Sequence, residues 1–407
     1  MTKPIPHPPN WLKFVIIFLL VLGISFRFVN LGKKVYWEDE TLTSMWTAGY
    51  SYSIGKKLYT GKEITTEDLQ QYQRLNPEKG LLDTVNVLTK SSEHPPLYFI
   101  LGRFWQQWFG SSVTAMRSLA ALFSVLVLPC MYWLCLELFE SSTVGWVAVG
   151  LAAVSPIFVR YAQEARQYSL WTVMILFSSA VLLRAIRGNT KLSWMTYAVT
   201  IVLSLYTHLF SGFVFIAHGI YVAIIERFRL TQTSTAYLLA SGIGVIAFTP
   251  WLWLIATRNP FYIMQWIERR LPFSDWLNFY IHHHSRIFWV LNSPRKSSLI
   301  LILCIFILAA YSIYFLYRYT EKRVWLFVVT LGIVTQVALI VPDLTRGGVR
   351  ALIERYAFPF YISILLAVAY LLATKITWES SIWRMQLWRS LAVVLLSGAV
   401  YCCAIAS

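Results

Sequence analysis

Long apolar segments separated by short polar connections run through almost the whole chain. About eleven of them approach the ~20 residues that an α-helix needs to cross the hydrocarbon core of a bilayer. They cover residues 12–29, 115–137, 143–160, 167–186, 192–207, 209–225, 237–257, 298–317, 324–341, 357–374 and 389–406. In lipid, helices satisfy their own backbone N–H and C=O groups, which isolated strands do not. The pattern therefore predicts an all-α polytopic membrane protein in which residues 1–407 form one membrane domain.

The segment 95–110 does not fit this pattern. At about sixteen residues it is short for a span, and it contains Arg103, Gln106 and Gln107. We expect a helix that lies on the membrane surface. The positive-inside rule supports this choice. If the segment does not cross, the basic clusters at 184–191, 227–229, 318–323 and 375–389 share the N-terminal side of the membrane, and if it crosses they all change sides.

This topology leaves two long connections on the face opposite the N-terminus. They are residues 30–114, which we expect to carry juxtamembrane helices, and residues 258–297. Loops of this length that lack the composition of disordered segments are usually functional. The sequence thus predicts a multi-pass protein of the cell membrane whose active side faces the extracytoplasmic, or periplasmic, space.

Composition excludes several classes of protein. With 57% hydrophobic and 13% charged residues, the chain has more apolar surface than a soluble domain of 407 residues needs. Basic cytoplasmic loops and an anionic lipid substrate account for the net charge of +16 better than nucleic acid, for which no basic soluble domain is present. All five cysteines lie in apolar stretches and indicate packing residues. Arg27 and Phe28 follow the first apolar segment in place of a cleavage pattern, so we expect it to remain as a span.

Polar residues of the kinds that carry chemistry gather on the predicted outer face. The first long loop opens with Glu38-Asp39-Glu40 and closes with Glu93-His94. Carboxylates are costly beside lipid, and those that persist there usually contact ions, protons or a polar substrate. Other connections add further candidates to the same face: Arg160, Gln163, Glu164, Arg166, Tyr168, His208, Arg355 and Tyr356.

This set suits the transfer of a sugar from a lipid phosphate. The acceptor hydroxyl needs a base as it attacks the anomeric carbon, and we assign that role to Asp39, with Glu40 beside it in the catalytic pair. The departing polyprenyl phosphate needs cations, and guanidinium groups match phosphate oxygens. We assign the donor phosphate to His94, Arg160, Arg166, Arg355 and Tyr356, and expect Gln163, Glu164 and Tyr168 to complete the site.

The same residues resemble those of a known family. Trp37-Glu38-Asp39-Glu40, His94-Pro95-Pro96-Leu97, Gln163-Glu164-Ala165-Arg166 and Glu354-Arg355-Tyr356 occur in the order seen in bacterial family-39-like glycosyltransferases of the GT-C superfamily, which are related to protein O-mannosyltransferases and lipid A aminoarabinose transferase. The resemblance covers about residues 10–375. It implies a GT-C fold, a juxtamembrane helix in the first loop and Asp39 as the base. The C-terminal soluble region of several relatives is missing here, which leaves acceptor recognition to the two long loops.

Plainer explanations exist for individual residues. An acid after a first span can be a solvated loop residue, His94 can begin a helix before the prolines, and arginines and tyrosines at helix ends can be interfacial anchors. Arg117 fits the start of the second span. The consecutive His282-His283-His284 point in different directions on any regular element, so we predict no metal site there. A divalent cation, Mg²⁺ or Mn²⁺, held by Asp39 or Glu40 stays open as an alternative.

The leading prediction is a membrane glycosyltransferase, hexosyl or pentosyl, that uses a polyprenyl-phosphate-linked donor and a hydroxyl acceptor on a glycolipid, polysaccharide or protein. Its partners would be these substrates and membrane lipids, with no nucleic acid. The alternative is a transporter or flippase for a lipid-linked or anionic solute. That class predicts polar groups near the bilayer midplane and interrupted helices in matching halves. A purely structural subunit explains neither the acid cluster nor the polar patch at 160–168.

Overall fold

Helices make up all the regular secondary structure in the described part of the chain, residues 7–54, 61, 63–258, 267–290 and 296–406 of the computed structural model. The α-helices are α1 (Asn10–Phe28), α2 (Glu38–Thr47), α4 (Thr66–Gln70), α5 (Leu81–Lys90), α6 (Leu97–Phe109), α7 (Val113–Phe139), α8 (Ser142–Ala153), α9 (Pro156–Ala162), α10 (Tyr168–Gly188), α11 (Lys191–Thr207), α12 (Ser211–Ile225), α13 (Gln232–Arg258), α14 (Phe273–Ser285), α15 (Lys296–Tyr319), α16 (Lys322–Arg346), α17 (Phe358–Trp378) and α18 (Ile382–Ala406). Short 3₁₀-helices are η1 (Gln71–Gln73), η3 (Arg350–Leu352) and η4 (Glu354–Tyr356).

Eight of these helices are long and apolar enough to cross a membrane: α1, α7, α10, α13, α15, α16, α17 and α18. Helices α8 and α9 are long and apolar enough only when they are taken together, and they are bent by 60° at the break between them. The described chain thus offers up to 9 spans by length and composition. The sequence-based count of about eleven also includes α11 and α12. They are helices where predicted, but have only 17 and 15 residues. The all-α polytopic architecture is confirmed.

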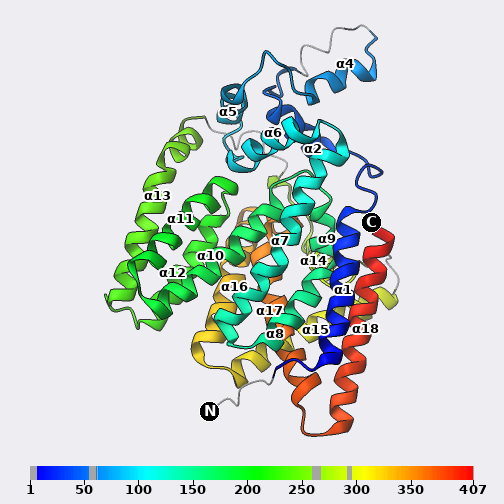
Figure 1. The fold of residues 1–407 in the computed structure, drawn as a ribbon, viewed down its shortest axis with the longest axis vertical. Coiled ribbons are helices and arrows are strands. Elements are labelled where there is room, and N and C mark those ends of the chain that lie inside the picture. The colour runs from blue at the N-terminus through cyan, green and yellow to red at the C-terminus, as the bar shows by residue number, and fades with distance from the viewer. Residues whose placement is uncertain (1–6, 55–60, 62, 259–266, 291–295, 407) are drawn as a thin grey trace.

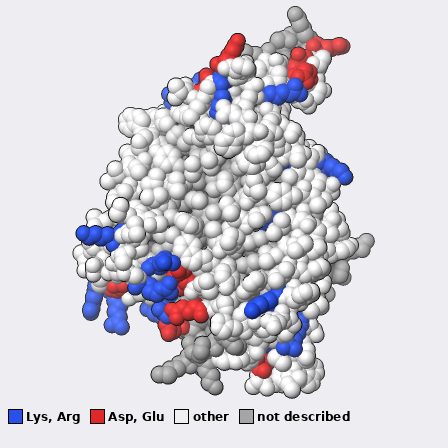
Figure 2. Space-filling model, in the orientation of Figure 1, with Lys and Arg blue, Asp and Glu red and all other residues white. Residues whose placement is uncertain are grey.

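The helices of the bundle run roughly along its long axis, and the two termini lie at opposite ends of it (Figure 1). Charged side chains are also concentrated at the two ends of the bundle. In Figure 2 they gather toward the two ends of the face and leave its middle almost uncharged. Near the N-terminal end, Glu137 pairs with Arg184 at 3.7 Å and with Arg187, and Arg323 pairs with Glu140 at 3.2 Å. The connection between α7 and α8, which lacks a basic residue of its own, is therefore surrounded by the basic ends of α10 and α16.

Helices α10 and α17 form the centre of the bundle. In each, 78% of the residues in its apolar 18-residue stretch are buried, compared with 22% in α13 and α18 at the periphery. Helix α17 packs against α8, α15, α16 and α18, and α10 packs against α7 and α11. A helix that is apolar on all sides has to lie inside a bundle or in lipid. These two central helices begin at Tyr168 and Phe358, next to the predicted site residues of the 163–167 and 354–356 segments.

The first long loop folds into a helical cap over the end of α7 (Figure 1). The doubtful segment 95–110 contains α6, which has 13 residues and is too short to span. Its polar residues face the cap. Arg103 is buried and donates to Thr47 O at 2.9 Å, and Gln106 accepts from Thr47 Oγ1 at 3.0 Å. The prediction of a juxtamembrane helix is confirmed. Of the second long loop, α14 lies within the described residues, and 259–266 and 291–295 lie outside them.

The break between α8 and α9 is stabilised by Arg27 of α1. Where α8 ends, the carbonyl groups of its last turn lose their helical partners. Arg27 donates to Ala153 O at 2.6 Å and to Ala152 O at 3.1 Å, and is fully buried. Gly23 permits this approach of α1, since a Cβ there would lie 2.3 Å from Ala153 O. Because the bend redirects α9, it sets the position of the 163–167 segment.

Labelling of single cysteines tests the topology. Ser112 caps the start of α7, and Gly188 ends α10 at the other end of the bundle, where an added Cβ would meet no atom within 4 Å. We expect a membrane-impermeant thiol reagent added outside intact cells to label Ser112→Cys and not Gly188→Cys, with the unsubstituted protein as background. Labelling of Gly188→Cys alone would invert the topology after the first loop.

Candidate functional site

The predicted site residues come from helix ends that meet at the cap end of the bundle. Asp39 and Glu40 lie in the first turn of α2, and His94 lies between α5 and α6. Helix α9 and the segment after it carry Arg160, Gln163, Glu164 and Arg166, and Tyr168 begins α10. Arg355 and Tyr356 lie in η4, just before α17. Segments more than a hundred residues apart in sequence thus reach one region, as the single-face argument predicted.

Glu40 is completely buried and has a different environment from Asp39. Its two carboxylate oxygens accept from Arg117 Nε at 2.8 Å and Nη2 at 2.7 Å, and Oε1 also accepts from Ala165 N at 2.8 Å. Arg117 donates further to Leu31 O at 2.7 Å and Val35 O at 2.8 Å. Both oxygens of Glu40 thus have partners in the protein. These contacts tie α2 to Arg117 and Ala165, and the catalytic role assigned to Glu40 stays a prediction.

Asp39 lies beside two arginines that are far from it in sequence. Its Oδ2 is 3.5 Å from Arg355 Nη2 and 3.9 Å from Arg166 Nη2. Arg166 Nη1 also donates to Asp39 O and to Thr43 Oγ1, both at 3.1 Å. The Asp39 side chain is 24% exposed, in contrast to the closed environment of Glu40. Its place at the N-terminus of α2 also favours a carboxylate.

Arg166 and Arg355 are held by aromatic rings. The Arg166 guanidinium lies 5.8 Å from the Trp46 ring and 6.0 Å from the Tyr168 ring, and that of Arg355 lies 5.4 Å from Trp37 and 5.7 Å from Tyr168. The Nε atom of each arginine is buried without a hydrogen-bond partner in the protein. A buried unpaired donor is costly, and a charged one more so. Both groups therefore have donors that an anionic ligand can satisfy.

A cavity of about 380 Å³, here called cavity A, lies on one side of these arginines. Its polar lining includes Glu93, His94, Tyr168, His208 and Tyr356, and its apolar lining includes Leu209, Phe210, Phe213, Leu339 and Pro342. Burial, together with the nearby charges of Arg166 and Arg355, lowers the pKa of His208 to about 3. The same factors, with His208, hold the pKa of His94 well below its usual value. His94 is thus neutral at pH 7, so it offers a phosphate a hydrogen bond and no charge.

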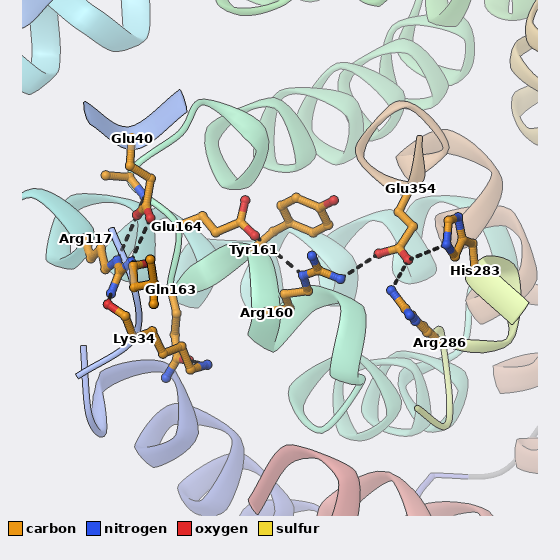
Figure 3. A network of polar contacts seen from close by, with 12 residues as sticks. Lys34, Glu40, Arg117, Arg160, Tyr161, Gln163, Glu164, His283, Arg286 and Glu354 are labelled. Carbon is orange, nitrogen blue, oxygen red and sulfur yellow. Dashed lines mark hydrogen bonds and ion pairs between the residues drawn. The ribbon is translucent and has the colours of Figure 1, made fainter. Parts of the chain in front are cut away.

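A second cavity of about 310 Å³, here called cavity B, lies beside Trp37, Glu40, Arg160 and Glu164. Arg160 Nη1 lies 3.1 Å from Glu354 Oε2, and Arg160 Nε lies 3.5 Å from Glu164 Oε1 (Figure 3). Arg160 was predicted to hold the donor phosphate together with His94, but the two residues line different cavities. Arg160 thus lies on the side of cavity B, and its role toward the donor phosphate stays a prediction.

Glu164 and Gln163 also line cavity B but differ in their contacts. Burial raises the pKa of Glu164 to about 7, and its Oε2 has no partner in the protein. Gln163 donates to Phe26 O at 2.6 Å and Val29 O at 2.9 Å, and accepts from Lys34. Gln163 thus ties the end of α1 to the site. The carboxyl of Glu164 thus pairs with Arg160 through Oε1, and its buried Oε2 has no partner in the protein.

Four residues of this region were missed as site residues in the sequence: Lys34, Arg117, Arg286 and Glu354. Glu354 is 6% exposed and joins Arg160 to Arg286 across cavity B (Figure 3). The signal for Glu354 was its place beside Arg355. Arg117 was interpreted as a residue that begins a span, and nothing in the sequence links it to Glu40. Arg286 follows the histidine run and had no distinguishing pattern.

The side chains around Asp39 do not fit a divalent cation. Two guanidinium groups face Asp39, and both oxygens of Glu40 are taken by Arg117 and Ala165. Within the described ranges, no group of three or more His, Cys, Asp and Glu side chains is placed to hold a metal ion. The Nδ1 atoms of the histidine run lie 2.8, 2.6 and 2.9 Å from separate backbone carbonyls, those of Asn278, Leu352 and Tyr280. We therefore assign no chemistry to a metal.

Comparisons with known proteins bear on the family and the fold. Residues 93–254 match the family model described as dolichyl-phosphate-mannose-protein mannosyltransferase. The structure is similar to the archaeal oligosaccharyltransferase AglB from Archaeoglobus fulgidus, solved with an inhibitory peptide and a dolichol-phosphate, with a TM-score of 0.57 and 14% identity over 97% of this chain and 55% of that one. It is also similar to ArnT from Cupriavidus metallidurans bound to undecaprenyl phosphate (TM-score 0.50, 14% identity, 96% of this chain and 74% of that one).

The apo form of the same ArnT gives a TM-score of 0.51 at 14% identity, over 96% of this chain and 73% of that one. No curated protein sequence matches the chain. The chain spans little more than half the length of AglB. The family model matches less than half of the chain, in the direction of the predicted resemblance to PMT-type proteins, and the likeness to the solved structures confirms the predicted GT-C fold.

Removing one partner of the Glu40–Arg117 pair should destabilise the protein strongly. Arg117→Ala leaves an uncompensated buried carboxylate, and we expect a loss of about 3–5 kcal/mol in the free energy of unfolding. Thermal unfolding of the purified protein in detergent measures this. Arg74→Ala is the control, because Arg74 and Glu67 form an exposed pair in the same cap, with 54% and 65% of their side chains accessible, and should cost less than about 1 kcal/mol. Equal effects of the two variants would contradict the assignment.

Proposed function

We propose that this relative of the dolichyl-phosphate-mannose-protein mannosyltransferases is an integral-membrane glycosyltransferase, built as one membrane domain over residues 1–407. It would transfer a sugar from a polyprenyl-phosphate-linked donor to an acceptor hydroxyl on the extracytoplasmic side of the cell membrane. The observation that carries the proposal is the position of Asp39. Its carboxylate lies 3.5 Å from Arg355 and 3.9 Å from Arg166, and each of these arginines has an Nε without a hydrogen-bond partner in the protein.

The donor phosphate would bind Arg166 and Arg355. Both guanidinium groups contact the ring of Tyr168, which lines cavity A together with Tyr356 and His94. Phosphate oxygens would complete the free Nε–H groups, and charge-assisted bonds of this kind are about twice as strong as neutral ones. The apolar part of cavity A, at the ends of α12 and α16, offers hydrocarbon contacts for the first isoprene units of the donor lipid.

The proposed reaction is a single displacement. The acceptor oxygen attacks the anomeric carbon, the bond from that carbon to the phosphate oxygen breaks, and the electron pair leaves with the polyprenyl phosphate. The acceptor proton passes to Asp39 Oδ2. Arg166 and Arg355 offset the charge that develops on the leaving phosphate. Polyprenyl phosphate and the glycosylated acceptor are the products.

Asp39 and the donor phosphate would share the same two arginines. A bound donor phosphate would compete with the Asp39 carboxylate for the guanidinium groups of Arg166 and Arg355.

The acceptor would enter from cavity B. Trp37 and Glu40, on either side of Asp39 in sequence, both line this cavity. Arg355 packs on Trp37, so this wall of cavity B contacts an arginine that is paired with Asp39. The Glu354 network then forms the far wall of the acceptor cavity (Figure 3).

A transfer assay tests the proposal. Purified protein is incubated with a polyprenyl phosphate carrying a radiolabelled sugar and with extracts of envelope lipid, polysaccharide and protein. A transferase moves the label to an acceptor and releases polyprenyl phosphate. A transporter or flippase would leave the donor chemically intact while moving it across proteoliposomes, and that result would reject the proposal.

Asp39→Asn keeps the shape of the side chain and removes its basicity. Turnover should fall by roughly 10²–10⁴-fold, the contribution of general-base catalysis, while donor binding survives. The control is Glu38→Gln, which makes the same change at the adjacent, exposed position and should retain most activity. Near-normal turnover of Asp39→Asn would rule Asp39 out as the base.

Replacing Arg166 or Arg355 with lysine keeps the charge and loses the planar fork. Each variant should raise the KM for the donor by roughly tenfold, or ~1.4 kcal/mol, with unfolding little changed. Both side chains would hold one phosphate. The free-energy change in donor KM of the double variant should therefore differ from the sum of the two single changes. Arg269→Lys, at an exposed position outside cavities A and B, is the control. An unchanged donor KM in Arg355→Lys would indicate that Arg355 is only an interfacial anchor.

A further inference from the structure

Cavity A is lined by two polar side chains that have no role in phosphate binding. They are Glu93, from the connection between α5 and α6, and Gln167, the residue before the start of α10. Glu93 Oε2 and Gln167 Oε1 are buried and have no hydrogen-bond partner in the protein. Both atoms are acceptors, in contrast to the unpaired Nε–H donors of Arg166 and Arg355. The region therefore suits a ligand that brings hydrogen-bond donors as well as an anionic group.

Glu93 is held in place by its neighbours in the chain. Trp251 Nε1 donates to Ser92 O at 2.9 Å, which ties the α5–α6 connection to α13. The ring of His94 packs against that of Trp46, with 4.8 Å between their centroids. The side chain of Glu93 is 10% exposed, and its Oε1 lies 3.8 Å from His94 Nε2. Because both flanking residues are anchored, the carboxyl group keeps its place although Oε2 has no partner of its own.

Gln167 is fixed by the start of α10. Its backbone carbonyl accepts from Trp171 N at 2.8 Å in the first turn of the helix, and the residue is buried. The next residue, Tyr168, also lines cavity A, and its ring lies 6.0 Å from the Arg166 guanidinium and 5.7 Å from that of Arg355. The unpaired amide oxygen thus belongs to a residue that lies directly between Arg166 and Tyr168 in the chain.

The chemistry of these unpaired atoms indicates what can complete them. A buried acceptor without a donor is costly, so a folded protein rarely contains one. Phosphate oxygens cannot satisfy Glu93 or Gln167, because they are acceptors themselves, and a hydrocarbon chain has no donors. Hydroxyl groups donate to such oxygens, and a sugar carries several of them close to its phosphate. A sugar joined to a phosphate therefore matches all four unpaired groups, the two acceptors and the two arginine donors.

The charge of Glu93 restricts the sugar further. Burial raises the pKa of Glu93 above its ordinary value, and the charge of Arg166 opposes this rise. A sugar acid would bring a second carboxylate close to Glu93 in a buried cavity, where like charges repel strongly. A neutral sugar avoids this repulsion. Its hydroxyl groups can donate to Glu93 in either protonation state, since a protonated carboxyl group still has an acceptor oxygen.

We propose that Glu93 and Gln167 form the subsite for the donor sugar, and that this sugar is neutral and carries free hydroxyl groups. The inference rests on the proposed function and specifies the donor class. The sugar occupies the polar part of cavity A, with its phosphate at Arg166 and Arg355 and the lipid along the apolar lining. Glu93 and Gln167 thereby determine which sugar the protein accepts.

Equilibrium binding to the full chain in nanodiscs tests this subsite without requiring turnover. The probes are undecaprenyl phosphate and the same lipid carrying mannose, glucose, galactose, arabinose or galacturonic acid. Competition with radiolabelled undecaprenyl phosphate gives each Kd. The ratio of the Kd of undecaprenyl phosphate to that of a sugar-bearing lipid measures the contribution of the sugar. For at least one neutral sugar we expect a ratio of roughly ten, or ~1.4 kcal/mol, since it completes two buried acceptors, and for galacturonic acid no gain.

Variants assign this contribution to the two side chains. Glu93→Ala and Gln167→Ala should each reduce the ratio by at least about threefold and change the Kd of undecaprenyl phosphate by less than about twofold. Neither should lower Tm without ligand, because the unpaired oxygens have no protein partner to lose. Glu93→Gln keeps a hydrogen-bonding group and should retain most of the ratio for a neutral sugar. Glu78→Ala and Gln107→Ala change the same residue types at exposed positions of the cap and are the matched controls.

The outcomes separate this inference from the proposed function. An unchanged ratio in both alanine variants, no gain from any neutral sugar, or tightest binding of the galacturonic acid lipid would overturn the subsite. Loss of undecaprenyl phosphate binding in both variants would place these residues at the phosphate, and a lower Tm without ligand would show a structural role, so either result would also overturn it. Sugar transfer with an unchanged ratio would reject this inference alone. A ratio that depends on Glu93 and Gln167, without any transfer, would reject the proposed function alone.

Discussion

The buried ion pair of Glu40 and Arg117 is the interaction on which the rest of the site depends. Removing two charges from water costs several kcal/mol per ion, and the pair persists only because its hydrogen bonding is complete. Arg117 donates through all its N–H groups, to both oxygens of Glu40 and to three carbonyls of the 31–35 segment. Glu40 in turn accepts from Ala165 N. One pair thus fixes α2, the start of α7 and the 163–167 segment relative to one another.

The position of Asp39 follows from this constraint. Successive residues on a helix point about 100° apart, so the direction of Glu40 toward Arg117 determines the direction of Asp39. Asp39 then faces Arg166, whose own segment is held by the Ala165–Glu40 bond. Asp39, the proposed base, and Arg166, half of the proposed phosphate site, are therefore placed by the same buried carboxylate. The bend between α8 and α9, which Arg27 stabilises, also helps to position Arg166, since it brings α9 across the end of α1.

Much of the fold could be predicted, because membrane helices are specified by long apolar runs that sequence shows directly. The positions of the helices and the surface location of α6 followed from length and charge. The break inside 143–160 was missed, although Ser155-Pro156 marks a helix start. The candidate site residues were predicted as a set that meets in one region, but their individual contacts could not be predicted. Glu40 and Asp39 are adjacent and chemically alike, and only the partners that tertiary packing brings to them, Arg117 and Arg355, distinguish them.

Hydrogen-bond completeness separates structural from ligand-binding arginines better than charge or burial does. Arg27 and Arg117 are fully buried, and their donors reach backbone carbonyls and side chains throughout. Arg166 is buried to nearly the same degree, yet its Nε–H has no partner, and Arg355 shares this feature. A fold rarely leaves a buried guanidinium donor unpaired, since desolvation of a charged group is costly. The two arginines that pair with Asp39 each retain such a donor, which supports the proposal that an anion with several oxygens binds there.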